Sequence, residues 1–195
     1  NHFTEANSWQ YSFAPVHALS RWQALLVKDG HSLDKQLDAL FSAPSSTLGR
    51  TQVDITGLIG QYAHGNEPSH HIAYLYNCTD SPWKGQEKVA EILETMYSDQ
   101  PFGYQGNEDC GQMSAWYVMS ALGLYPTAPG NTNYQIGRPL FKKAQIKLPN
   151  KKRLSIEAPN NSASAKYVKE VSFNTSKVNE TEIDHNEIKN GGLLL

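Results

Sequence analysis

The sequence has 195 residues, of which 39% are hydrophobic and 18% are charged, a composition that suits one globular domain or a domain with a small appendage. Its formal net charge is -2 and its Lys and Arg residues are scattered, so it lacks the basic stripe that a nucleic-acid partner needs. No run approaches the roughly 18 consecutive apolar residues that a membrane helix requires, so no membrane span is expected.

The larger, N-terminal part of the chain has apolar residues at helical spacing, from Trp9 to about Tyr125. Loops with Gly, Pro, Asn and Asp interrupt this spacing. The predicted helices, in chain order, span residues 17–28, 33–41, 68–76, 85–97 and 111–122. Paired helices in series are typical of an α-toroid.

After Pro126 the pattern changes to short alternating runs that are typical of strands. These runs span residues 134–136, 144–148, 154–158, 167–173 and 193–195. Turn residues between them favour a small antiparallel β unit. The predicted fold class is therefore mainly α followed by a small β unit, with domains at 1–126 and 127–195. Because the chain starts without Met and stops in an apolar run, we expect it to be a fragment, truncated in the β unit.

Three segments carry more Trp, Tyr, His, Asn and carboxylate groups than a helix core needs: residues 4–11, 60–76 and 106–117. Each polar cluster is expected at a loop or a helix start, where free backbone N–H groups and polar side chains can converge on a ligand. Aromatic rings for a sugar face and carboxylates and amides for its hydroxyls occur together in these stretches. The sequence therefore predicts a carbohydrate site.

Hydrolysis of a glycosidic bond requires a carboxylic acid near the leaving oxygen and, in the inverting case, a carboxylate that activates water. Glu5 is a candidate acid, because Phe3 and Trp9 could desolvate it and favour its protonated form. Asp109 is a candidate base, because a helix start favours its charged form. The structural alternatives are an N-cap for Asp109 and a structural hydrogen bond for Glu5.

The histidines at 64, 70 and 71 lack the His-Glu-x-x-His spacing of a zinc site, and hydrogen-bonded structure is the favoured alternative. Cys78 and Cys110 also lack zinc spacing and are expected as free thiols. Asn66 and Glu67 offer hard oxygen donors that suit calcium better than a soft metal. The alternative for this pair is a capped helix start, with Pro68 opening the helix.

Several strings together resemble the signatures of glycoside hydrolase family 92, the calcium-dependent, inverting exo-α-mannosidases. They are Gly-Asn-Glu-Pro-Ser-His-His at 65–71, Gly-Asn-Glu-Asp-Cys-Gly-Gln-Met-Ser-Ala-Trp-Tyr at 106–117 and Ser-Ala-Leu-Gly-Leu-Tyr-Pro at 120–126. Glu-Ala-Asn-Ser-Trp-Gln-Tyr at 5–11 resembles the family's general-acid segment, and residues 188–193 resemble its closing strand motif. The resemblance covers essentially the whole chain.

This resemblance implies that the chain is the later part of an (α/α)6 barrel and that the family's N-terminal β-sandwich is missing. In the family, the site lies between the sandwich and the barrel and contains an essential Ca2+ ion. The resemblance also implies that the whole polypeptide cleaves a mannose-containing glycan and is exported to the periplasm, the cell surface or the medium. A carbohydrate-binding or scaffold fragment without turnover, and an α-toroid glycosidase for another sugar, remain open alternatives.

By position, the resemblance makes Glu5 the general acid and Asp109 the general base, with Asn107 where relatives often have a second acidic residue. Val53 and Asp54 would line the leaving-group side, where α-1,2-specific members have a His-Glu pair that this chain lacks. The other residues expected to bind substrate are Trp9, His64, Glu67, His70 and His71. The calcium ligands are expected to include Asn66 and Glu67.

Overall fold

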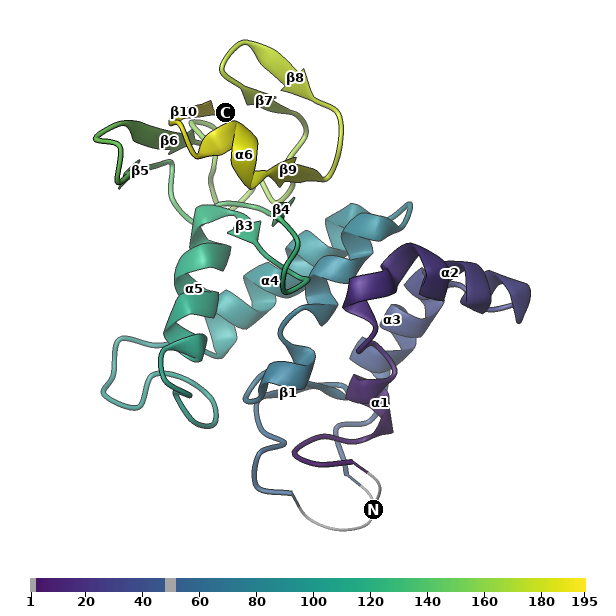
Figure 1. Cartoon of the computed structure of the whole chain (residues 1–195). Helices are drawn as coiled ribbons and strands as arrows, with labels where there is room; N and C mark the ends of the chain where they lie inside the picture. Colours follow the sequence, from purple (N-terminus) through teal and green to yellow (C-terminus); the bar gives the residue numbers. More distant parts are fainter. Residues whose placement is uncertain (1–2, 48–51) are drawn as a thin grey trace.

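The computed structural model describes residues 3–47 and 52–195 (Figure 1). Its α-helices are α1 (Ser8–Tyr11), α2 (Leu19–Lys28), α3 (Leu33–Ser42), α4 (Pro82–Thr95), α5 (Gln112–Leu122) and α6 (His185–Ile188), and its 3-10 helices are η1 (Val16–Ala18), η2 (Glu67–Ser69) and η3 (Ile72–Cys78). None of these helices is long and apolar enough to span a membrane. Both cysteines are free thiols, as expected.

The strands form three small sheets. They are β1 (Leu58–Ile59), β2 (Tyr62–Ala63), β3 (Leu124–Tyr125), β4 (Asn133–Ile136), β5 (Lys143–Lys147), β6 (Arg153–Glu157), β7 (Val171–Phe173), β8 (Ser176–Val178), β9 (Glu182–Asp184) and β10 (Gly192–Leu194). The sheet orders are β1-β2, β3-β4-β9 and β5-β6-β10-β7-β8. Most pairs are antiparallel as predicted, but β10 pairs with β6 in parallel.

The predicted helices near α2, α3, α4 and α5 are confirmed within a few residues. In α3 the apolar side chains spaced for one helix face, Leu33, Leu37 and Leu40, are buried. The predicted α-helix at 68–76 is wrong, because this stretch forms the 3-10 helices η2 and η3. Every residue from 72 to 77 is buried, so packing on all sides sets this backbone instead of one apolar face.

Two apolar cores lie under these elements. The helical core gathers side chains from α3, η3, α4 and α5, with Trp116 fully buried among them. The second core lies between the small sheets and includes Ile136, Ile156 and Leu194. The cores are joined where Asn77 of η3 donates from its side-chain amide to the carbonyl of Ile136, at 2.9 Å.

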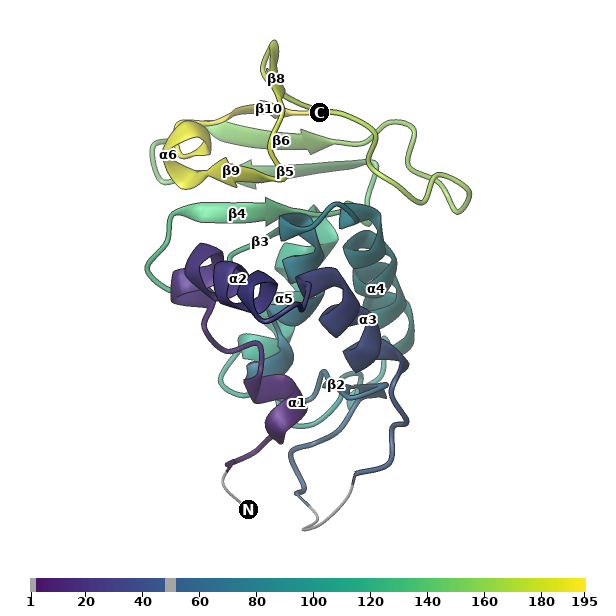
Figure 2. The ribbon, with the colours of Figure 1, turned by 90° about the vertical axis from the view of Figure 1, so that its right-hand side faces the viewer.

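The β unit lies at one end of the helical part (Figures 1 and 2). The segment that leads into α1, the β1-β2 hairpin and the loop that leads into α5 lie at the opposite end (Figures 1 and 2). These three segments contain most of the chemistry-bearing residues, so the fold collects them at the end of the molecule opposite the β unit.

Candidate active site

Two glycines, Gly65 and Gly106, let separate loops approach each other closely at this end. A Cβ atom on Gly65 would lie 1.9 Å from Oγ1 of Thr56, and one on Gly106 would lie 2.5 Å from the carbonyl oxygen of Gly65. Only glycine fits such close approaches. The loop after Gln52, the turn after β2 and the loop before α5 therefore converge on one point.

Glu5 lies in a tight turn before α1, with a left-handed φ of 59°. For a residue with a Cβ atom this conformation costs free energy, and such strain concentrates at functional sites. Glu5 is exposed, and Phe3 stacks on Tyr11 with ring centroids 5.2 Å apart. The expected desolvation of Glu5 by its aromatic neighbours is therefore not found in this part of the chain.

The helix α1 is fixed against the β1-β2 turn by side-chain amides. Asn7 caps α1 and forms a capping box with Gln10. The Gln10 amide donates to the carbonyl of Gln61, and the Asn7 amide donates to Oε1 of Gln61 at 3.1 Å. The turn that presents Glu5 is thereby anchored to the segment that carries His64 and Asn66.

Asp109 also has a left-handed backbone, with φ of 54°, and Cys110 and Gly111 follow with φ of 56° and 101°. The N-cap of α5 is Gly111, so the N-cap alternative for Asp109 is wrong. Glu108 serves the helix start instead: it accepts from the amide of Gly111 and from Oγ of Ser114 at 2.8 Å. The hydrogen bond from Ser114 lowers the pKa of the Glu108 carboxyl.

Among residues 3–47 and 52–195, no hydrogen bond or ion pair involves the carboxylates of Glu5 or Asp109. These carboxylates are thus free of structural partners in the described chain, whereas Glu108 beside them is committed to the helix. Asn107 is exposed two positions before Asp109 in the same loop.

Trp9 and Val53 are exposed, with 40% and 82% of their surface accessible, and Asp54 is partly buried. The carbonyl of Asp54 accepts from the amide of Thr56 at 3.1 Å, and Thr56 lies against Gly65. Val53 and Asp54 therefore lie close to the point where the three loops meet. The expected leaving-group residues and the expected catalytic residues therefore lie at the same end of the fold.

His64 is fully buried behind this surface. Its Nδ1 lies 2.8 Å from the Tyr62 hydroxyl and its Nε2 lies 2.7 Å from the Tyr97 hydroxyl, which itself donates to the carbonyl of Met113. Since Tyr97 donates onward, His64 must donate from Nε2 and accept at Nδ1. Burial lowers the pKa of His64 to about 3, which keeps the ring neutral.

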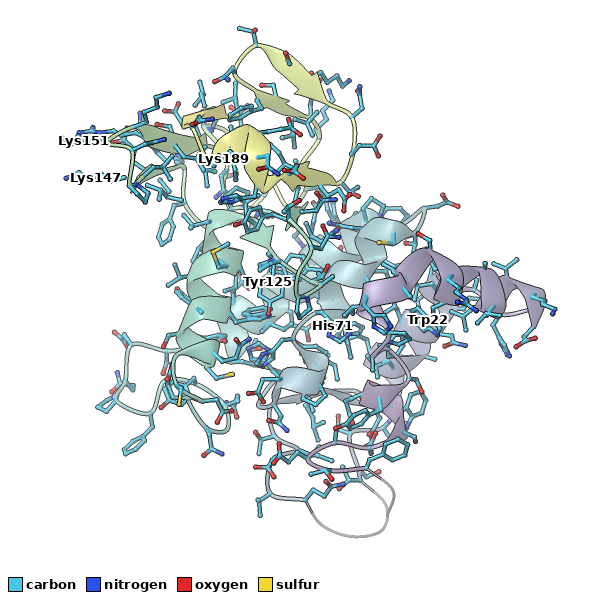
Figure 3. The ribbon with its side chains drawn as sticks, in the orientation of Figure 1. Trp22, His71, Tyr125, Lys147, Lys151 and Lys189 are labelled. Atoms are coloured by element: carbon cyan, nitrogen blue, oxygen red, sulfur yellow. The ribbon has the colours of Figure 1, made fainter. Side chains whose placement is uncertain are left out.

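His71 reaches from the start of η3 to the segment after α1. Its Nε2 donates to the carbonyl of Phe13 at 2.8 Å, and the Phe13 ring meets Trp22 edge-on. Figure 3 shows His71 between Tyr125 and Trp22 in this view. Burial lowers the pKa of His71 to about 4, while the Phe13 carbonyl opposes that shift.

Asn66 and Glu67 supply adjacent oxygen donors. The Asn66 amide nitrogen donates to the carbonyl of Glu5 at 2.7 Å, which leaves Oδ1 available, and Glu67 is exposed. Within the described ranges, no three His, Cys, Asp or Glu side chains cluster as metal ligands. The two donors have the chemistry that calcium prefers, and they supply part of the roughly six to eight oxygens it takes.

Four further residues connect these segments and were not predicted as site residues: Gln10, Gln61, Gln112 and Trp116. Trp116 donates from Nε1 to the carbonyl of His70, and Gln112 donates to its ring. Their positions inside the polar and aromatic segments at 4–11, 60–76 and 106–117 were the available signal. A cavity of about 380 Å3 lies elsewhere, between Arg138, Ile156 and Tyr167 in the β unit.

Residues 1–195 match the sequence model of the glycosyl hydrolase family 92 catalytic domain. The chain is similar to a solved family GH92 α-mannosidase from Bacteroides thetaiotaomicron, in complex with mannoimidazole. That pair has 35% identity and a TM-score of 0.88, over 97% of this chain and 25% of the solved one. A solved family GH92 inverting mannosidase from B. thetaiotaomicron VPI-5482 has 35% identity and a TM-score of 0.81, over 98% of this chain and 27% of its own.

An uncharacterized secreted glycosidase from Arthroderma benhamiae is 29% identical over 133 residues, which make up 67% of this chain and 17% of that protein. The chain therefore spans 25% of the length of the solved α-mannosidase in complex with mannoimidazole and 17% of the length of the Arthroderma glycosidase. The match to the family extends over every residue of the sequence. The chain belongs to glycosyl hydrolase family 92.

Proposed function

We propose that this chain is the later part of an (α/α)6 barrel, with its following β unit, in a longer, exported polypeptide that removes terminal α-linked mannose from mannans or N-glycans. The proposal includes a β-sandwich N-terminal to the chain and a calcium-dependent, inverting reaction. Its main support is that Glu5 and Asp109 both have left-handed backbones and carboxylates without a hydrogen bond or ion pair in the described chain. They belong to the segments that lead into α1 and α5, which lie at one end of the fold.

In this proposal Glu5 is the general acid and Asp109 is the general base. Glu5 gives its proton to the glycosidic oxygen as the bond to the anomeric carbon breaks. Asp109 takes a proton from the water that attacks the opposite face of the sugar, so the product is β-mannose. Asn107, exposed two residues before Asp109, can donate a hydrogen bond that orients this water or the carboxylate.

The remaining residues bind and orient the sugar. Trp9, which is exposed four residues after Glu5, would offer an aromatic face to the sugar, and Val53 and Asp54 would line the leaving-group side. Asn66 and Glu67 would hold calcium through their oxygens. Bound calcium would contribute positive charge and coordination to the hydroxyls of the terminal mannose. His64, His70 and His71 support this surface from behind, through the hydrogen bonds of their rings.

The test is mannose release from α-1,2-, α-1,3-, α-1,4- and α-1,6-mannobiose by the proposed full-length protein, with and without EDTA. Proton NMR of the first-formed product distinguishes inversion from retention. The proposal expects calcium-dependent release of β-mannose from at least one linkage. First-formed α-mannose contradicts the inverting mechanism, and sugar binding without release supports the carbohydrate-binding alternative.

A further inference from the structure

The backbones around Glu5 and Asp109 are connected through one buried side chain, that of His70, which is 3% exposed. Its Nε2 lies 2.9 Å from the carbonyl of His64, and its Nδ1 lies 2.9 Å from Nε2 of Gln112. A carbonyl only accepts and an amide nitrogen only donates, so His70 must carry its proton on Nε2. Both ring nitrogens are therefore committed within the protein.

On one side, this ring fixes the turn at 64–66. The carbonyl of His64 accepts from the ring, and Asn66 in the same turn donates to the carbonyl of Glu5 at 2.7 Å. The position of the Glu5 backbone therefore depends on a turn that His70 holds closed.

On the other side, the ring fixes the start of α5. Gln112 donates from its side chain to His70 and from its backbone to the carbonyl of Asp109, at 3.1 Å. Trp116, one turn further along α5, donates from Nε1 to the carbonyl of His70 at 2.9 Å. The left-handed turn at Asp109 is thereby tied to the same residue.

We propose that His70 is a positioning residue that sets the separation of the Glu5 and Asp109 segments. This inference rests on the proposed function. Burial lowers the pKa of His70, against the opposing effects of the His64 carbonyl and of Asp109, and so favours the neutral ring that can both donate and accept. A histidine that served only the core would have no reason to join the backbones of both carboxylate segments.

The experiment uses the proposed full-length protein and two substrates, an α-mannobiose and dinitrophenyl α-mannoside. The aryl leaving group departs without protonation, so it needs the base but not the acid. His70→Ala should lower kcat on both substrates, by about 100-fold on mannobiose, because small displacements of catalytic groups have effects of that size. KM should change little.

Conservative variants separate the two links. His70→Gln keeps a donor near Nε2 and should recover more activity on mannobiose, because the turn at 64–66, which bonds to the Glu5 carbonyl, stays closed. His70→Asn keeps an acceptor near Nδ1 and should recover more activity on the aryl substrate, because Gln112 keeps its partner.

Asn77→Ala is the control, since it removes a buried hydrogen bond between the helical part and the β unit. It should lower the Tm and leave kcat per folded molecule unchanged.

Hydrogen exchange of the same variants tests the link without activity. His70→Ala should accelerate exchange in both segments 4–7 and 108–113, whereas Asn77→Ala should not. Unchanged exchange in either segment of His70→Ala would overturn the inference. So would a His70→Ala variant that, like Asn77→Ala, has a lower Tm but an unchanged kcat per folded molecule. If the wild-type protein cleaves neither substrate, the proposed function is wrong, and the exchange data still decide whether His70 links the segments.

Discussion

The side-chain amide of Asn66 donates a hydrogen bond of 2.7 Å to the backbone carbonyl of Glu5, across 61 positions of sequence. Asn66 stands at the N-cap of η2 but makes no side-chain capping bond. Its nitrogen is therefore used to fix the turn that presents the proposed acid, and its oxygen remains available as a ligand.

Asn66→Asp should lower kcat for mannobiose, by about 100-fold if Glu5 shifts by about 1 Å. A carboxylate cannot donate to the Glu5 carbonyl, and the two oxygens repel each other. The measurement is kcat and KM of the proposed full-length protein. Asn150→Asp is the matched control, because Asn150 makes the same kind of amide-to-carbonyl bond, to Lys189 in the β unit. Equal activity of the two variants would contradict a role for the Asn66–Glu5 bond.

Gly106→Ala should destabilise the protein more than Gly130→Ala. Both glycines have a left-handed φ, of 72° and 82°, but a Cβ atom at Gly106 would lie 2.5 Å from the Gly65 carbonyl and one at Gly130 meets nothing within 4 Å. Backbone strain costs about 1 kcal/mol at each site, and the clash adds roughly 1–3 kcal/mol at Gly106. Thermal unfolding of the two variants measures the difference. Equal Tm values would mean that the loops do not meet at Gly65.

Stability should fall as the pH falls below neutrality, through the buried histidines. The pKa of His71 is lowered by burial from 6.5 to about 4, so between these pH values the unfolded chain binds a proton that the folded chain does not. The free energy of unfolding therefore decreases with decreasing pH, by about 3 kcal/mol for His71. His64, with its pKa lowered to about 3, acts in the same direction.

Unfolding midpoints across this pH range test the effect. His71→Gln should flatten the pH dependence, because its amide can still donate to the Phe13 carbonyl but does not titrate. A wild-type slope in His71→Gln would show that His71 is not the group that titrates.

The regular elements were predictable because one face of each is apolar. The spacing of Leu33, Leu37 and Leu40 predicts α3, and alternation at Ala144 and Ile146 predicts β5. The 3-10 geometry of η3 was not predictable, because burial on every side removes a directional pattern. The short elements β8, β9 and α6 were also missed, since three or four mostly polar residues carry little periodicity.

The sequence indicated which segments hold the candidate site, but not how they are joined. The left-handed backbone at Glu5 has no signature in residue type, because a positive φ is uncommon for glutamate. Glutamine is also common on solvent-exposed helix faces, so its presence at 112 does not predict a hydrogen bond to His70. Residue type also suggested that Asp109 caps α5, whereas in the structure the side chain of Glu108 accepts the hydrogen bond from the amide of Gly111 at the helix start.

The most direct test of the proposed mechanism compares mannose release by four forms of the proposed full-length protein: wild type, Glu5→Gln, Asp109→Asn and Glu108→Gln. Glu108 is the matched control, because it lies beside Asp109 but bonds to the helix start. We expect Glu5→Gln and Asp109→Asn to abolish release from mannobiose, and Glu108→Gln to keep turnover per folded molecule despite a lower Tm. Release that survives Glu5→Gln or Asp109→Asn at the wild-type rate would contradict the proposed mechanism.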